Sequence, residues 1–185
     1  MIEIFILSLI QGITEFLPIS SSSHLILISD SFKFENQSLS IDVSLHIGSF
    51  IAVIVYFYKD ILNFYENKIL FFKIIISSIP VLIIGFLLVE TQYIEKIRNL
   101  ETIAWTTIIF GILLYISDKF KLEKNLKENF SFKAAIFIGI LQVFSLMPGV
   151  SRSGIGITAA RFLKFDRVNS AKISFLLSIP ILGAV

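Results

Sequence analysis

The sequence predicts an all-α integral membrane protein. We expect a multi-span helix bundle with two inverted-repeat re-entrant helical hairpins that meet near the membrane midplane. Three observations favour this fold. Apolar residues make up 55% of the 185 residues and charged residues only 16%, against about 45–50% and about 25% in soluble domains. Two polar segments, 11–24 and 141–158, interrupt the apolar runs. Three stretches long enough to span a membrane lie between these segments.

The first hairpin is predicted from two short helices and the break between them. Residues 1–10 are apolar, and the serines from Ser20 to Ser23 are expected to cap a second helix that runs to Ser29. Each helix is too short to cross a hydrocarbon core of about 30 Å. Broken backbone at that depth is tolerated only where protein or a water-filled cavity surrounds it. The pair is therefore expected to enter the membrane and return on the same side.

The remaining elements follow from the apolar runs. Spans are predicted at about 43–58, 73–89 and 102–117, and the charged segment 118–133 is expected to be a solvated connector. A second hairpin is predicted at about 134–163, and a last helix begins near Ser170.

We expect one membrane domain over 1–185, with repeat 1 at about 1–117 and an incomplete repeat 2 at about 132–185. By symmetry two more helices are expected after Val185. The chain is then a fragment, or a shortened form that needs a partner to close the bundle, for which a homodimer is a candidate.

The two polar segments are related at an offset of 130 residues: Glu15-x-x-Pro18-x-x-Ser21 lies over Ser145-x-x-Pro148-x-x-Ser151. Chance similarity of two short segments is the alternative. Three spans, an odd number, separate the hairpins, so these must enter from opposite faces, as in inverted-repeat folds.

Basic residues are unevenly distributed between the two faces. We call side A the face that holds 30–42 and 90–101; it carries three basic residues, whereas the opposite face, side B, carries 12. By the positive-inside rule side B is cytoplasmic. The first hairpin then opens from the exterior.

Glu15 and Arg152 are the two charges that an apolar hairpin should not contain. An ionised residue at the bilayer centre costs roughly 2.5–3.5 kcal/mol, so each needs a partner, either the other or a ligand. A buried pair that only joins the hairpins is the structural alternative.

The hairpin breaks predict a site for a multiply charged anion. Helix starts offer free backbone amides and a positive dipole end, and an arginine offers a planar fork that matches phosphate oxygens. The serine run that includes Ser20 supplies one such start. The segment with Gly149, Ser151, Ser153 and Gly154 is expected to precede the other.

Three more polar residues suggest chemistry. His24 can give or take a proton, although a satisfied polar contact is the alternative. Glu15 can act as a base or hold Mg²⁺ or Ca²⁺. Gln11 lies one helical turn earlier, on the same face, and can coordinate through its amide but cannot take a proton. His46, at the start of a span, is expected to be a packing or interface residue.

The segments QGITEFLPISSSSHL and LMPGVSRSGIGIT resemble the two signature regions of the bacterial undecaprenyl-diphosphate phosphatases, the bacitracin-resistance family. The similarity extends through VSLHIGSFIAVIVYFYKD and ISFLLSIP, and so over nearly the whole chain. The resemblance implies a metal-dependent, multi-pass hydrolase of the bacterial inner membrane. Such an enzyme removes the terminal phosphate of undecaprenyl diphosphate, which recycles the lipid carrier for peptidoglycan synthesis and confers bacitracin resistance.

The resemblance also implies residue roles. Glu15, Ser21, His24 and Arg152 are the expected catalytic residues, and Glu15 with Gln11 the expected ligands of Mg²⁺ or Ca²⁺. Gln11 stands where glutamate is common, and Ser23 where glycine is usual. Members of the family are longer by roughly two helices. The expected partners are a polyprenyl diphosphate substrate and membrane lipids, with no nucleic acid and no organic cofactor. The expected substrate-binding residues are Gln11, Ser20, Gly149, Ser151, Ser153, Gly154 and Thr158.

Three other functions are considered. Inverted repeats and broken helices also occur in transporters, so a polyprenyl-phosphate flippase is the main rival. An unrelated membrane phosphatase of the vanadate-sensitive type would place basic residues ahead of its histidine, and none precedes His24. A truncated, non-catalytic paralogue is the third.

Overall fold

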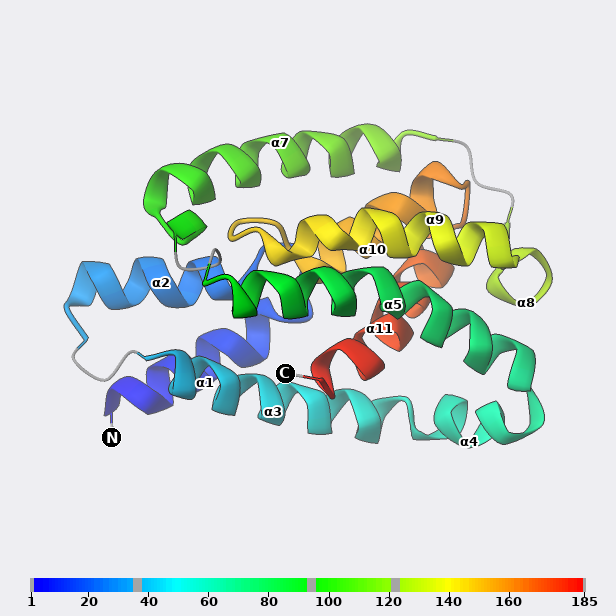
Figure 1. Cartoon of the computed structure of the whole chain (residues 1–185), viewed down its shortest axis with the longest axis horizontal. Coiled ribbons are helices and arrows are strands. Elements are labelled where there is room, and N and C mark those ends of the chain that lie inside the picture. Colours follow the sequence, from blue (N-terminus) through cyan, green and yellow to red (C-terminus); the bar gives the residue numbers. More distant parts are fainter. Residues whose placement is uncertain (1, 35–37, 93–95, 121–123, 185) are drawn as a thin grey trace.

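The computed structural model describes residues 2–34, 38–92, 96–120 and 124–184, and in these ranges the chain is helical apart from turns and loops. Two hairpins of short helices enter the bundle from opposite ends, and their tips meet in its middle (Figure 1). This arrangement confirms the predicted all-helical fold with opposed hairpins. The first hairpin is α1 (Ile2–Thr14) and α2 (Ser21–Phe32); the second is α9 (Phe132–Gln142), the short 3₁₀ helix η1 (Val143–Leu146) and α10 (Arg152–Phe162).

The three predicted spans are all present as helices. They are α3 (Leu39–Tyr56), α5 (Lys68–Glu90) and α7 (Leu100–Asp118). Of these, α5 and α7 are long and apolar enough to cross a membrane, and α5 continues through Pro80. The first span differs from its prediction because α3 ends in a 63° bend, after which α4 (Tyr58–Glu66) follows. This bent pair is a third span if the two helices are counted as one.

The helices sort into the two ends that the charge pattern predicts. The described parts of 30–42 and 90–101 lie at one end of the bundle in Figure 1, and α4 and α8 (Leu126–Asn129) lie at the other, together with the start of α11 (Arg167–Leu182). The described elements that carry basic residues of side B therefore lie toward a single end.

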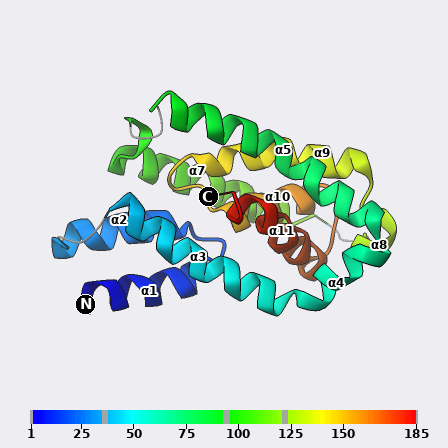
Figure 2. The ribbon, with the colours of Figure 1, turned by 60° about the horizontal axis from the view of Figure 1, so that its bottom comes forward.

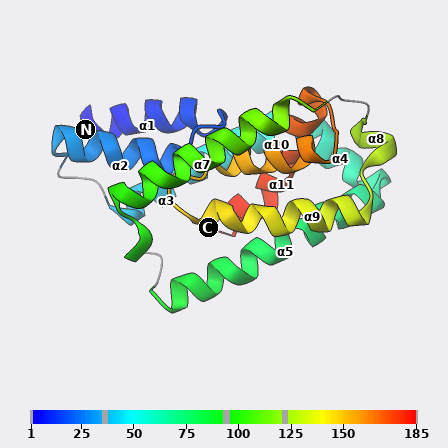
Figure 3. The same cartoon turned by 90° about the horizontal axis from the view of Figure 1, so that it is seen from above.

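The core lies where α11 crosses the bundle between α3 and the pair α5–α9 (Figure 2). Small residues let these backbones approach closely, as is common between membrane helices. A Cβ on Gly139 of α9 would collide with the backbone of Ser77 in α5, whose hydroxyl donates to the carbonyl oxygen of Ala135 at 2.6 Å. The neighbouring courses of α5 and α9 are visible from above in Figure 3.

The connector after α7 departs from its prediction. The charged segment was expected to be fully solvated, but Leu126 and Phe130 are buried in the core cluster. Backbone hydrogen bonds from Lys124 to the carbonyl oxygen of Lys164 (3.1 Å), and from Asp166 back to Lys124 (3.2 Å), hold this segment beside the start of α11. The segment is therefore partly anchored in the core through these two apolar side chains.

Gly149, in the second hairpin tip, is expected to be intolerant of a side chain. Its φ of 92° lies in the left-handed region, and a Cβ there would collide with the Thr106 hydroxyl and lie 2.7 Å from the carbonyl oxygen of Ile103. We expect Gly149→Ala to lower the free energy of unfolding by at least about 2 kcal/mol, measured by thermal unfolding in detergent. Gly111→Ala is the matched control on α7, where a Cβ meets nothing within 4 Å. Equal stability of the two variants would contradict this account of the tip.

Candidate active site

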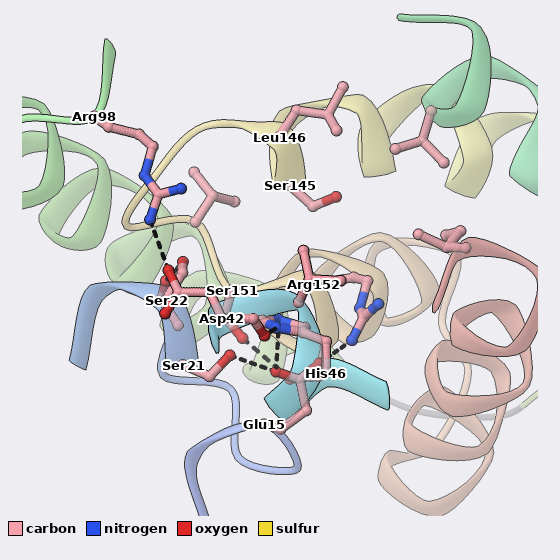
Figure 4. A pocket seen from close by; sticks show the side chains of 16 residues that line it. Glu15, Ser21, Ser22, Asp42, His46, Arg98, Ser145, Leu146, Ser151 and Arg152 are labelled. Carbon is pink, nitrogen blue, oxygen red and sulfur yellow. Dashed lines mark hydrogen bonds and ion pairs between the residues drawn. The ribbon is translucent and has the colours of Figure 1, made fainter. Parts of the chain in front are cut away.

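The two hairpin tips and α3 enclose a cavity of about 230 Å³, which we call the central cavity. Its apolar wall includes Val43, Val81, Leu146 and Ile181. Its polar wall joins residues from distant parts of the sequence (Figure 4). These polar residues are Glu15, Ser20, Ser21, Ser22, Asp42, His46, Arg98, Ser145, Ser151, Arg152 and Ser153.

Both internal repeats contribute residues to this cavity. Positions related by the offset of 130 line it from both hairpins: Glu15 with Ser145, Ser21 with Ser151, and Ser22 with Arg152. The two tips therefore face each other across one site, as expected for opposed repeats.

Glu15 is the centre of the polar contacts. Its side chain is 7% exposed, and Arg152 donates to Oε1 across a sequence separation of 137 residues. The hydroxyl of Ser21 and the amide nitrogen of Gln11, the latter at 3.0 Å, donate to Oε2. The structure thus brings three of the four predicted catalytic residues, Glu15, Ser21 and Arg152, into direct contact.

The second hairpin is also bonded to the backbone of the first. Ser153 donates to the carbonyl oxygen of Leu17 at 2.9 Å, and Ser151 accepts from the amide of Gly154 at 3.1 Å as the N-cap of α10. The sequence predicted that Ser153 and Gly154 precede the helix. They lie instead in its first turn, because α10 begins at Arg152. Thus Arg152 and two hydroxyls project from a helix start into the cavity region.

The serine run of the first hairpin does not cap α2 as predicted. Ser20 is the N-cap residue, but its side chain makes no capping hydrogen bond, and its φ of 36° is left-handed. Its hydroxyl instead lies 3.0 Å from that of Ser23 and 3.4 Å from that of Ser22. The three hydroxyls therefore form a cluster, and Ser20 and Ser22 of this cluster line the central cavity.

His24, the fourth predicted catalytic residue, lies apart from Glu15. It lines a neighbouring cavity of about 390 Å³ with Gly149 and Gly154, two of the predicted substrate-binding residues. Its Nδ1 lies 2.9 Å from the carbonyl oxygen of Ser20, which can only accept, so Nδ1 carries the proton. Ser20 and Ser151 line both cavities. The walls of the two cavities therefore share these two serines.

Thr158, also predicted to bind substrate, is buried and donates to the carbonyl oxygen of Gly154 at 2.8 Å. It does not line the central cavity. Its contact supports the first turn of α10, which carries Arg152.

The sequence interpretation missed α3 as a wall of the site. His46 was expected to be a packing residue, but it lines the central cavity with Nε2 3.7 Å from Glu15 Oε2. Its Nδ1 donates to the carbonyl oxygen of Asp42 at 2.7 Å, so in the neutral ring Nε2 is an acceptor. The signal was present in the spacing, because Asp42, His46 and Ser49 recur at helical intervals in an apolar span.

The predicted cation ligands are engaged with each other. Gln11 turns its amide nitrogen to Glu15 and to the hydroxyl of Ser49, at 3.0 and 3.2 Å, while its Oε1 is buried without a hydrogen-bond partner. In the described ranges no group of three or more His, Cys, Asp or Glu side chains is placed to hold a metal ion. A cation that binds through one or two carboxylates and substrate phosphates, as Mg²⁺ commonly does, does not require such a group.

Removing one partner of the Glu15–Arg152 pair is expected to be costly for stability. Glu15→Ala leaves the guanidinium, whose side chain is 17% exposed, without its carboxylate; the expected loss is about 3–5 kcal/mol of unfolding free energy. The control is Asp60→Ala, which breaks the more exposed pair with Lys172 (2.6 Å) and should cost less than about 1 kcal/mol. Chemical denaturation in detergent measures both, and similar losses would argue against a buried, partner-dependent charge at Arg152.

Comparison with known proteins relates this site to a family. The family described as "Bacitracin resistance protein BacA" matches residues 4–185. A protein named "Undecaprenyl-diphosphatase" from Pelagibacter ubique (strain HTCC1062) is 51% identical over 180 residues, which cover 97% of this chain and 70% of that protein. Proteins with the same name from Jannaschia sp. (strain CCS1) and Saccharophagus degradans (strain 2-40) are 42% and 45% identical. The matches cover 96% and 95% of this chain and 71% of each relative.

The matched region contains both hairpin tips, α3 and Arg98, that is, the whole polar wall of the central cavity. The chain belongs to the BacA family of bacitracin resistance proteins.

Proposed function

We propose that this protein hydrolyses undecaprenyl diphosphate to undecaprenyl phosphate and inorganic phosphate. Relatives at up to 51% identity carry the name undecaprenyl-diphosphatase. The observation that carries the proposal is the contact of Ser21 and Arg152 with one buried carboxylate, Glu15, in a cavity between two helix tips. A hydroxyl beside a base is suited to attack a phosphoanhydride. A guanidinium in the same cavity is suited to stabilise the negative charge that develops.

The reaction breaks the bond between the terminal phosphorus and the bridging oxygen, and water supplies the elements of the new phosphate. Arg152 holds the negative charge that develops on the diphosphate oxygens. The Ser21 hydroxyl already donates to Glu15, so its proton has an acceptor when the oxygen attacks phosphorus or orients the attacking water. The bridging oxygen leaves on the lipid phosphate. His24 is the proposed proton carrier, acting across the hydroxyls of Ser20 and Ser151 that line both cavities.

We also propose that a divalent cation, Mg²⁺ or Ca²⁺, takes part, with Glu15 and Gln11 as the ligands suggested by the sequence. The charges of the cavity support this. The described residues that line it include two carboxylates and two guanidinium groups, which cancel. A diphosphate therefore enters a site with no net positive charge. A hard cation held by Glu15 and Gln11 would supply the positive charge that neutralises the substrate and stabilises the transition state.

The proposed location is the bacterial inner membrane, with several spans and side B in the cytoplasm. The apolar helices support a membrane protein, and the crowding of basic residues at one end supports the orientation. Arg98 and Asp42, from the side A end of the bundle, line the central cavity, which supports access to the diphosphate from the exterior leaflet. The homodimer stays a prediction. Hydrolysis is favoured over the flippase alternative by the relatives' names.

Phosphate release from undecaprenyl diphosphate tests the catalytic assignment. We expect Ser21→Ala, His24→Ala and Arg152→Ala each to lower kcat by about 100-fold or more, because each removes a nucleophile, a proton carrier or an electrostatic contact. Ser8→Ala and Arg167→Ala, exposed residues outside the cavity, should retain wild-type turnover. Retained turnover in both the Arg152 and the His24 variants would refute the mechanism.

The orientation is tested with reporter insertions at the two ends. A reporter that is active only in the cytoplasm should be active after Lys124, in the basic side B connector, and inactive after Gln92, which lies on side A between α5 and α7. This pattern follows from the positive-inside rule. Exterior exposure of the Lys124 insertion would contradict the proposed topology.

A further inference from the structure

The central cavity holds a second carboxylate, Asp42 of α3, that is incompletely paired. The residue is 6% exposed and lines the cavity. Its Oδ2 accepts from Arg98 at 2.9 Å, whereas its Oδ1 is buried and has no hydrogen-bond partner in the described part of the chain. A buried polar atom without a partner is destabilising, and more so when the group is charged. Such an atom therefore marks a position where a partner is expected.

The other carboxylate of the cavity has no comparable vacancy. Both oxygens of Glu15 are engaged, Oε1 by Arg152 and Oε2 by Ser21 and Gln11. Glu15 thus accepts from three donors and is more fully paired than Asp42. Asp42 Oδ1 offers a carboxylate oxygen that no donor occupies.

Arg98 is a weak competitor for this carboxylate. It lies outside the helices, two residues before α7, and its side chain is 28% exposed. It reaches Asp42 through a single nitrogen, as the dashed line in Figure 4 shows. The arginine of this pair is more exposed than Arg152, so an ion of higher charge density can replace the guanidinium.

We propose that Asp42 is a ligand of a divalent cation in the central cavity, and that Arg98 occupies the carboxylate in the cation's absence. The cation's role with the diphosphate rests on the proposed function; its binding to Asp42 does not. Asp42 lies one helical turn from His46, on the α3 face that reaches Glu15. One carboxylate with water and phosphate oxygens is a common coordination for Mg²⁺, which fits the absence of a three-residue cluster among the described side chains.

Mn²⁺ binding to the purified full chain in detergent tests the inference, with free Mn²⁺ followed by electron paramagnetic resonance and no lipid substrate present. We expect Asp42→Asn to weaken Mn²⁺ binding on the order of tenfold or more, because an amide lacks the charge of the carboxylate. Arg98→Met should tighten Mn²⁺ binding by about three- to tenfold, because it removes a competing positive charge. Asp30→Asn, an exposed carboxylate outside the cavity, is the control and should bind as wild type.

The opposite signs distinguish a ligand from a structural ion pair. If the pair only joins α3 to the segment before α7, both variants lose stability and neither tightens Mn²⁺ binding, which would overturn the proposal. Wild-type protein that binds no Mn²⁺, with or without methylene diphosphonate, would also overturn it. Binding is measured without turnover, so failure of hydrolysis leaves this test intact. Conversely, an active wild type whose Asp42→Asn variant binds Mn²⁺ normally refutes only the role of Asp42.

Discussion

The buried ion pair between Glu15 and Arg152 is the interaction on which the rest of the structure depends. Each charge lies at the tip of a hairpin whose helices are too short to cross a bilayer. Neither charge is tolerable alone in apolar surroundings. Removing one partner of a buried ion pair lowers stability by far more than the intact pair contributes to it. The pair therefore requires that the two tips meet, which places a helix start, several hydroxyls and a carboxylate around one cavity.

The packing of the second hairpin keeps this meeting point in place. Gly139 lies against the backbone of α5, and Gly156 of α10 leaves room only for Ser174 of α11. Ser174 donates to the carbonyl oxygen of Ser153 at 3.1 Å, next to the arginine that enters the cavity. In a membrane, close packing of small residues and hydrogen bonds between helices replace the hydrophobic driving force of soluble proteins. The position of Arg152 is thus set by contacts on the far side of α10.

α3 adds a second ion pair to the site, because Asp42 lines the cavity together with its partner Arg98. Each of the two ion pairs cancels, so the cavity carries no net charge when His46 is neutral. This cavity has no excess positive charge with which to bind a diphosphate. Binding therefore depends on a mobile cation, or on the replacement of one ion-pair partner in the cavity by the ligand or its cation. The two pairs differ in burial, since the side chain of Arg152 is 17% exposed and that of Arg98 is 28% exposed. The more exposed pair is the one suited to exchange.

The sequence alone determined the membrane class, the two opposed hairpins, the uneven distribution of the basic residues and the need of Glu15 and Arg152 for a partner, either each other or a ligand. These features follow from hydropathy, from breaks in apolar runs and from the cost of a lone buried charge, all of which are local or additive along the chain. Only the tertiary structure decided which histidine faces Glu15, which atom of Gln11 points to it, and that Asp42 meets Arg98. Those outcomes depend on how a helix is rotated against its neighbours. Asp42, His46 and Ser49 mark one face of α3, but their spacing does not say which side chains that face meets, because its neighbours come from distant parts of the sequence.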